Sequence, residues 1–161
     1  MFATLIYLAA VVAANLSVAA FGPIVTPINA FFLIGLDLSL RDVLHARWSG
    51  DRLVLRMGLL IATAGAISYA LNPASETIAL ASVIAFVVSN TADALVFQRL
   101  AKAGYLVRSN ASNTAGAALD SLIFPSIAFG GFLPAVVLGQ FVAKVAGGAL
   151  WSLVFKKLRP S

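Results

Sequence analysis

Long apolar stretches dominate the sequence and leave few folds open to it. They cover residues 2–20, 28–44, 53–71, 77–97, 114–130 and 133–155. Each is close to the roughly 20 residues that an α-helix needs to cross a bilayer. Hydrophobic residues make up 61% of the chain and charged residues 11%, whereas soluble domains carry about 45–50% and about 25%. We therefore predict an all-α integral membrane protein, with residues 1–161 forming a single domain of six transmembrane helices.

The basic residues predict how these helices are oriented. Six spans place both termini on one side of the membrane, together with the connectors that follow the second and fourth spans. Every Lys and Arg except Lys144 then falls on this side, and the opposite loops carry only Glu76. Because basic residues accumulate on the cytoplasmic side, both termini are expected to be cytoplasmic. This distribution explains the formal net charge of +5 without a nucleic-acid partner.

The sequence lacks the residue sets that most enzymes require. It has no cysteine and a single histidine, His45, which lies in a polar connector beside Arg47. We find no paired histidines for zinc, no serine with a histidine base and no phosphate-binding glycine motif. Asp93 and Asp120, the two aspartates in the central apolar segments, also lack the glycine-containing motifs of membrane aspartyl proteases. We expect no catalytic activity, no cofactor and no bound metal.

The stretch from Ser89 to Phe129 contains two apolar segments that each carry one carboxylate. A carboxylate inside a membrane span costs several kcal/mol, so its presence indicates a function. On a helix, two sets of residues each form one stripe at steps of three and four: Phe86, Asn90, Asp93 and Phe97 in the first segment, and Asn113, Gly116, Asp120 and Phe124 in the second. We interpret the two stripes as the floor of a ligand site.

Other polar residues lie inside the apolar stretches and allow two readings each. Asn15 could bind a ligand or make a hydrogen bond between helices. Asp37 and Arg41 are four residues apart and can pair along one helix. Lys144 is the lone cation inside a predicted span, so it neutralises Asp37, Asp93 or Asp120, or contacts the substrate.

These side chains suit a flat heterocycle. Carboxylates accept paired N–H groups, amides both donate and accept, and phenyl rings can stack on the ligand or face lipid. A purine-like compound with an amide and an amino group would match them. The predicted substrate-binding residues are Asn15, Asn90, Asp93, Phe97, Asn113, Asp120, Phe124, Gln140 and Lys144.

The two halves of the chain resemble inverted copies of each other. Each half has an asparagine in its first span (Asn15 and Asn90) and an aspartate in its second (Asp37 and Asp120). Three spans per half would invert the second copy, as in many transporters.

Several motifs resemble those of the vitamin uptake transporter family, which includes the queuosine precursor transporters. They are Ser89-Asn90-x-x-Asp93-x-x-Val96-Phe97, Arg108-x-x-x-Ser112 and Leu119-Asp120-Ser121-x-x-Phe124-x-x-Ile127-Ala128-Phe129-x-Gly131. The resemblance implies a transporter in a bacterial plasma (inner) membrane that imports a 7-deazapurine.

The family is also similar to the substrate-binding subunits of energy-coupling-factor transporters. The resemblance therefore leaves open a vitamin-binding subunit that needs a partner ATPase, and a non-transporting membrane scaffold is a further alternative. The expected partners are a small heterocyclic substrate and the lipid bilayer, with a homo-oligomer or an energy-coupling subunit as further candidates.

Overall fold

The computed structural model describes residues 2–48 and 52–158, and almost all of them are helical. None of the described residues forms a strand, so the predicted all-α class is confirmed. In chain order the elements are α1 (Phe2–Phe21), the 3-10 turn η1 (Gly22–Val25), α2 (Thr26–Asn29), the π-helical turn η2 (Ala30–Ile34), α3 (Gly35–Arg47), α4 (Leu53–Leu71), the 3-10 turn η3 (Pro73–Ser75), α5 (Glu76–Arg99), α6 (Tyr105–Ala128) and α7 (Pro134–Leu158).

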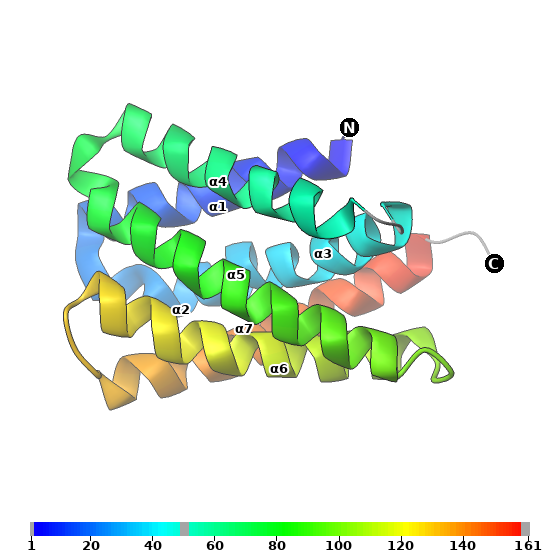
Figure 1. The fold of residues 1–161 in the computed structure, drawn as a ribbon. Coiled ribbons are helices and arrows are strands. Elements are labelled where there is room, and N and C mark those ends of the chain that lie inside the picture. The colour runs from blue at the N-terminus through cyan, green and yellow to red at the C-terminus, as the bar shows by residue number, and fades with distance from the viewer. Residues whose placement is uncertain (1, 49–51, 159–161) are drawn as a thin grey trace.

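The helices lie side by side with their axes roughly parallel and their directions alternating, and α2, η2 and α3 follow one another as a single segment (Figure 1). The connections at residues 22–25, 72–75 and 129–133 lie together at one end, which we call the turn end. At the other end α3 and α5 finish and α4 and α6 begin. We call it the basic end because it carries the exposed side chains of Arg47, Arg52, Arg56, Arg99 and Lys102.

The outer surface of the described residues is rich in large apolar side chains, such as Phe32, Leu59 and Leu95, which are all more than half exposed. Within the part of the chain that the structure describes, three stretches are long and apolar enough to cross a membrane: Phe2–Leu44, Pro73–Arg99 and Pro134–Phe155. A soluble protein rarely exposes apolar surface on this scale. The surface and the helix lengths together indicate a membrane protein with several passes.

Five of the six predicted helical stretches agree with the structure to within about three residues at each end. The fifth does not, because residues 114–130 were expected and the helix is α6, Tyr105–Ala128. The polar run before Asn113 looked like a connector. It is helical because Ser109 and Asn113 find hydrogen-bond partners inside the bundle, and the connector shrinks to residues 100–104.

The continuous segment of α2, η2 and α3, which we call the second helical segment, packs closely on α7 through glycines. A Cβ atom at Gly35 would lie 2.7–2.9 Å from the backbone of Gly147 and Gly148, and one at Gly147 would overlap the carbonyl oxygen of Phe31. The adjacent carbonyl, that of Phe32 in η2, accepts a hydrogen bond from Trp151 Nε1 at 3.2 Å. The π-helical turn therefore lies where two backbones meet, which fixes the position of α7 against the first half of the chain.

Candidate ligand-binding site

A small cavity of about 30 Å³ lies between the helices in the half of the bundle nearest the turn end. Its walls come from the end of α1, the start of the second helical segment, the first part of α5, the end of α6 and the first part of α7. The lining residues are Ala14, Asn15, Val18, Thr26, Ala30, Ile34, Ser82, Phe86, Asp120, Phe124, Gln140 and Lys144. Four of the twelve carry amide or charged side chains, in a bundle whose surface is mostly apolar.

Lys144 organises one wall of this cavity. Its Nζ lies 2.5 Å from Asp120 Oδ2, 2.8 Å from Gln140 Oε1 and 3.2 Å from Ser121 Oγ. The side chain is almost completely buried. A buried charge is tolerated when it is paired and hydrogen-bonded, and these three contacts supply both conditions. We call these four residues the lysine cluster.

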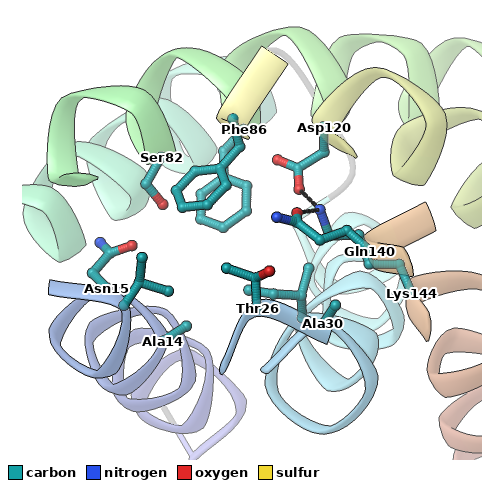
Figure 2. Close-up of a pocket in the computed structure, with 12 residues that line it drawn as sticks. Ala14, Asn15, Thr26, Ala30, Ser82, Phe86, Asp120, Gln140 and Lys144 are labelled. Atoms are coloured by element: carbon teal, nitrogen blue, oxygen red, sulfur yellow. Dashed lines mark hydrogen bonds and ion pairs between the residues drawn. The ribbon is translucent and has the colours of Figure 1, made fainter. Parts of the chain in front are cut away.

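Two polar atoms of the lysine cluster have no hydrogen-bond partner among the described residues. They are Asp120 Oδ1 and Gln140 Nε2, and both are buried. Figure 2 shows both side chains on the same side of the cavity, next to the lysine that bonds their other polar atoms. An unpaired buried acceptor or donor costs about 1–3 kcal/mol. The cavity wall can therefore gain stability from a ligand that bonds these atoms.

Asn15 and Ser82 lie on the opposite side of the cavity (Figure 2). Asn15 Nδ2 donates to Ser68 Oγ at 3.1 Å, and Ser68 Oγ donates in turn to the carbonyl of Ala64 at 2.8 Å. The predicted hydrogen bond between helices is therefore confirmed. Because Asn15 also lines the cavity, the ligand contact stays a prediction.

Aromatic rings complete the walls. Phe86 is 2% exposed and lies between the two polar sides of the cavity (Figure 2). Phe124 also lines the cavity, and its ring meets that of Phe129 edge to face at 6.2 Å. The cavity therefore combines polar groups with flat apolar surfaces.

Arg41 is a second cation inside the bundle. Its Nη2 lies 2.7 Å from Asp37 Oδ2, its Nη1 donates to Ser89 Oγ at 3.1 Å, and its guanidinium lies 4.9 Å from the Phe86 ring centre. Both Arg41 and Asp37 are completely buried. The pairing of Asp37 with Arg41 is confirmed, but the description of Lys144 as the lone cation inside a span was wrong. Arg41 is buried because its guanidinium packs against Asp37, Ser89 and Phe86 inside the bundle.

Another polar group lies nearer the basic end, and we call it the serine network: Ser39, Asp42, Ser109, Asn113 and Ser152. Ser109 Oγ donates to Asp42 Oδ2 and lies 2.8 Å from Ser152 Oγ. Asn113 Nδ2 reaches Ser109 Oγ at 3.3 Å and Ser152 Oγ at 3.4 Å, and Ser39 Oγ donates to the carbonyl of Gly148 at 3.1 Å. The network joins α3, α6 and α7.

The structure brings five of the nine predicted binding residues to the cavity: Asn15, Asp120, Phe124, Gln140 and Lys144. The other four are buried on the predicted stripes but lie farther toward the basic end. Asn113 belongs to the serine network. Phe97 lies under the guanidinium of Arg108, 3.9 Å from its ring centre. Asn90 and Asp93 lie on α5 between Phe86 and Phe97, and a Cβ atom at Gly116 would be 3.5 Å from that of Asp93.

Sequence reasoning missed Thr26 and Ser82 as cavity residues and Ser39 and Ser152 as network residues. Serine and threonine are common in membrane helices, and no spacing distinguishes those that face a cavity. The side chain of His45 lies outside the described residues. Among the residues that the structure describes, no three His, Cys, Asp or Glu side chains could hold a metal ion.

Comparisons with known proteins provide the last observation. No curated protein and no solved structure matches the chain. A family model does match, and it covers residues 1–156, nearly the whole length of the chain. Its description is "Putative vitamin uptake transporter". The chain therefore belongs to this family of membrane transporters.

Proposed function

We propose that this chain is a six-span transporter that imports a queuosine precursor or a related 7-deazapurine across a bacterial plasma membrane. The observation that carries the proposal is the cavity beside the lysine cluster. A buried carboxylate and a buried amide there each keep one polar atom without a partner among the described residues, next to the ring of Phe86. Such a site suits a small, flat ligand with hydrogen-bonding groups on one edge.

The closed cavity leaves little room. Its volume of about 30 Å³ is enough for roughly two water molecules. A fused two-ring heterocycle therefore requires the lining helices to move apart when it binds, as alternating access in a transporter allows. Phe86 and Phe124 offer the flat surfaces that such a ring system would contact.

The basic end supports an orientation in the membrane. Its five exposed basic side chains would face the cytoplasm, which puts the cavity in the half of the bundle nearer the outside. That position suits an importer, because its substrate enters from the outside. The buried ion pairs Asp37–Arg41 and Asp120–Lys144, one in each half of the chain, support a single domain built as a three-plus-three inverted repeat.

Cysteine labelling tests this orientation. Ala74 lies in η3 at the turn end and Lys102 lies in the α5–α6 connection at the basic end, and both are exposed. In intact cells, Ala74→Cys should react with a membrane-impermeant maleimide, and Lys102→Cys should react only with a permeant one. Labelling of Lys102→Cys by the impermeant reagent would show that the six-span topology is wrong.

Uptake of a radiolabelled 7-deazapurine tests the function. Cells that express the chain should accumulate the label, and at label concentrations below saturation cells that express Asp120→Asn at the same level should accumulate much less. Liposomes that contain only the purified chain distinguish a self-sufficient transporter from a subunit that needs a partner ATPase. If neither cells nor liposomes take up the label and the wild-type protein binds no 7-deazapurine, the proposal fails and a membrane scaffold becomes the better reading.

A further inference from the structure

Lys144 has no proton left for a ligand. An ammonium group carries three N–H donors, and Nζ has three acceptors, on Asp120, Gln140 and Ser121, at 2.5–3.2 Å. Although Lys144 lines the cavity, its hydrogen-bonding capacity is fully used within the lysine cluster. Lys144 can therefore affect a ligand only by orienting the side chains that it contacts, Asp120 and Gln140.

The lysine fixes which atom of Gln140 faces the cavity. Oε1 accepts from the ammonium group at 2.8 Å. The reversed amide would place its NH₂ donors against an N–H donor, so this orientation is the favourable one. Nε2 is then the free group, and it is a donor without a partner among the described residues.

The same lysine divides the two oxygens of Asp120. Oδ2 lies 2.5 Å from Nζ, and Oδ1 is buried with no partner in the described part of the chain. Asp120 and Gln140 are each at least 97% buried and both line the cavity. Their free atoms therefore form one acceptor and one donor on the same cavity wall (Figure 2).

We infer that Lys144 is a positioning residue that sets Asp120 and Gln140 as an acceptor–donor pair for the lactam edge of a neutral heterocycle. The ligand's C=O accepts from Gln140 Nε2, and its adjacent ring N–H donates to Asp120 Oδ1. This inference rests on the proposed function for the general class of substrate. It adds that the lysine makes no contact with the ligand and that the recognised edge is uncharged.

The charge of the cluster favours a neutral ligand. The ammonium of Lys144 is offset by the carboxylate of Asp120 at contact distance. A ligand carboxylate placed on the same wall would meet Asp120 Oδ1 and gain no bond from the lysine. Like charges at such distances repel strongly where water is scarce. A lactam meets neither problem.

Two pairs of probes test this inference by thermal shift on the purified full chain. Each pair compares a lactam with its O-methyl ether, which replaces the ring N–H with a lone pair: 7-deazahypoxanthine with 6-methoxy-7-deazapurine, and 4-pyrimidinone with 4-methoxypyrimidine. Wild-type protein should prefer the lactam by about tenfold to a hundredfold, the size expected for one hydrogen bond to a charged group.

Asp120→Asn should abolish or reverse this preference. The oxygen of the introduced amide can still accept from Lys144, and the amide NH₂ can then donate to the ring nitrogen of the ether. Gln140→Glu should keep the oxygen that Lys144 bonds and lose the donor, and it should weaken lactam binding by about tenfold to a hundredfold. The ratio of the two affinities does not depend on stability. Ser152→Ala, in the serine network, is the control and should keep the wild-type ratio.

The possible results separate the two proposals. If neither lactam stabilises the wild-type protein, or if Asp120→Asn and Gln140→Glu both keep the wild-type ratio and affinity, the inference is wrong. If the pyrimidine pair shows the expected reversal and the 7-deazapurine pair does not bind, the inference holds and the proposed substrate is wrong. If Asp120→Asn does not fold, Gln140→Glu alone decides.

Discussion

The lysine cluster and the serine network are both buried polar groups on α6 and α7, yet they differ in what lies beside them. The lysine cluster borders the cavity and leaves Asp120 Oδ1 and Gln140 Nε2 facing it without partners among the described residues. The serine network is not in contact with the cavity. Its hydroxyl groups bond to one another, to Asp42 and to a backbone carbonyl.

This difference shows when a buried polar group in a membrane helix indicates a ligand. Both groups join α6 to α7, and both contain an aspartate that would be costly to bury alone. Among the described residues of the two groups, the lysine cluster alone places unpaired polar atoms beside a cavity. We infer that the serine network holds α3, α6 and α7 together, and that the lysine cluster both holds helices and binds ligand.

The largest expected effect is the loss of the lysine. Lys144→Met leaves the carboxylate of Asp120 buried without its cation, and breaking a buried pair in this way costs about 3–5 kcal/mol. The purified variant should melt at a much lower temperature than wild type. The double variant Lys144→Met/Asp120→Asn removes the unpaired charge and should recover most of this loss. A double variant no more stable than the single one would contradict the pairing.

An effect of intermediate size is expected at the contact between α7 and the second helical segment. Gly147→Ala places a Cβ atom against the carbonyl of Phe31, so the two backbones must move apart at a cost of about 1–3 kcal/mol. Gly58→Ala on α4 is the matched control, because a Cβ atom there would have no described neighbour within 4 Å. Thermal unfolding should separate the two, and equal melting temperatures would mean that the contact is not close.

A smaller effect is expected in the serine network. Ser152→Ala removes a hydroxyl that contacts Ser109, Ser39 and Asn113, which should lower the free energy of unfolding by about 0.5–1.5 kcal/mol. Ligand affinity should not change, because Ser152 is not in contact with the cavity. A loss of affinity at unchanged stability would place the network in the binding site and remove the distinction between the two regions.

The sequence allowed much of the fold to be predicted, because hydropathy determines where helices can cross a membrane. It failed at the start of α6, where Ser109 and Asn113 looked like loop residues until their partners on α3 and α7 were known. The π-helical turn at Ala30–Ile34 could not be foreseen either. It faces Gly147 and Trp151, more than 100 residues away in the chain.

The site was predicted in part for a related reason. Helical spacing identified the buried face of α5 and α6 correctly, but a stripe extends along the whole helix. Asn113 and Phe124 are eleven positions apart, which corresponds to about 16 Å along the axis at 1.5 Å per residue. One small cavity cannot contact both ends of such a stripe. Periodicity therefore identifies which face of a helix is buried, but not how far along the helix the site lies. For the same reason it left the acidic partner of Lys144 undecided among three aspartates.

The most direct test of the account compares two isosteric changes, Asp120→Asn and Asp93→Asn, for binding of 7-deazahypoxanthine to the purified protein. Asp120 lines the cavity and Asp93 lies outside it, although both are buried on facing helices. The account predicts that Asp120→Asn weakens binding by about tenfold to a hundredfold, while Asp93→Asn keeps the wild-type affinity even if it melts at a lower temperature. Wild-type affinity in a well-folded Asp120→Asn protein, together with a loss in Asp93→Asn, would contradict the account and move the site toward the basic end.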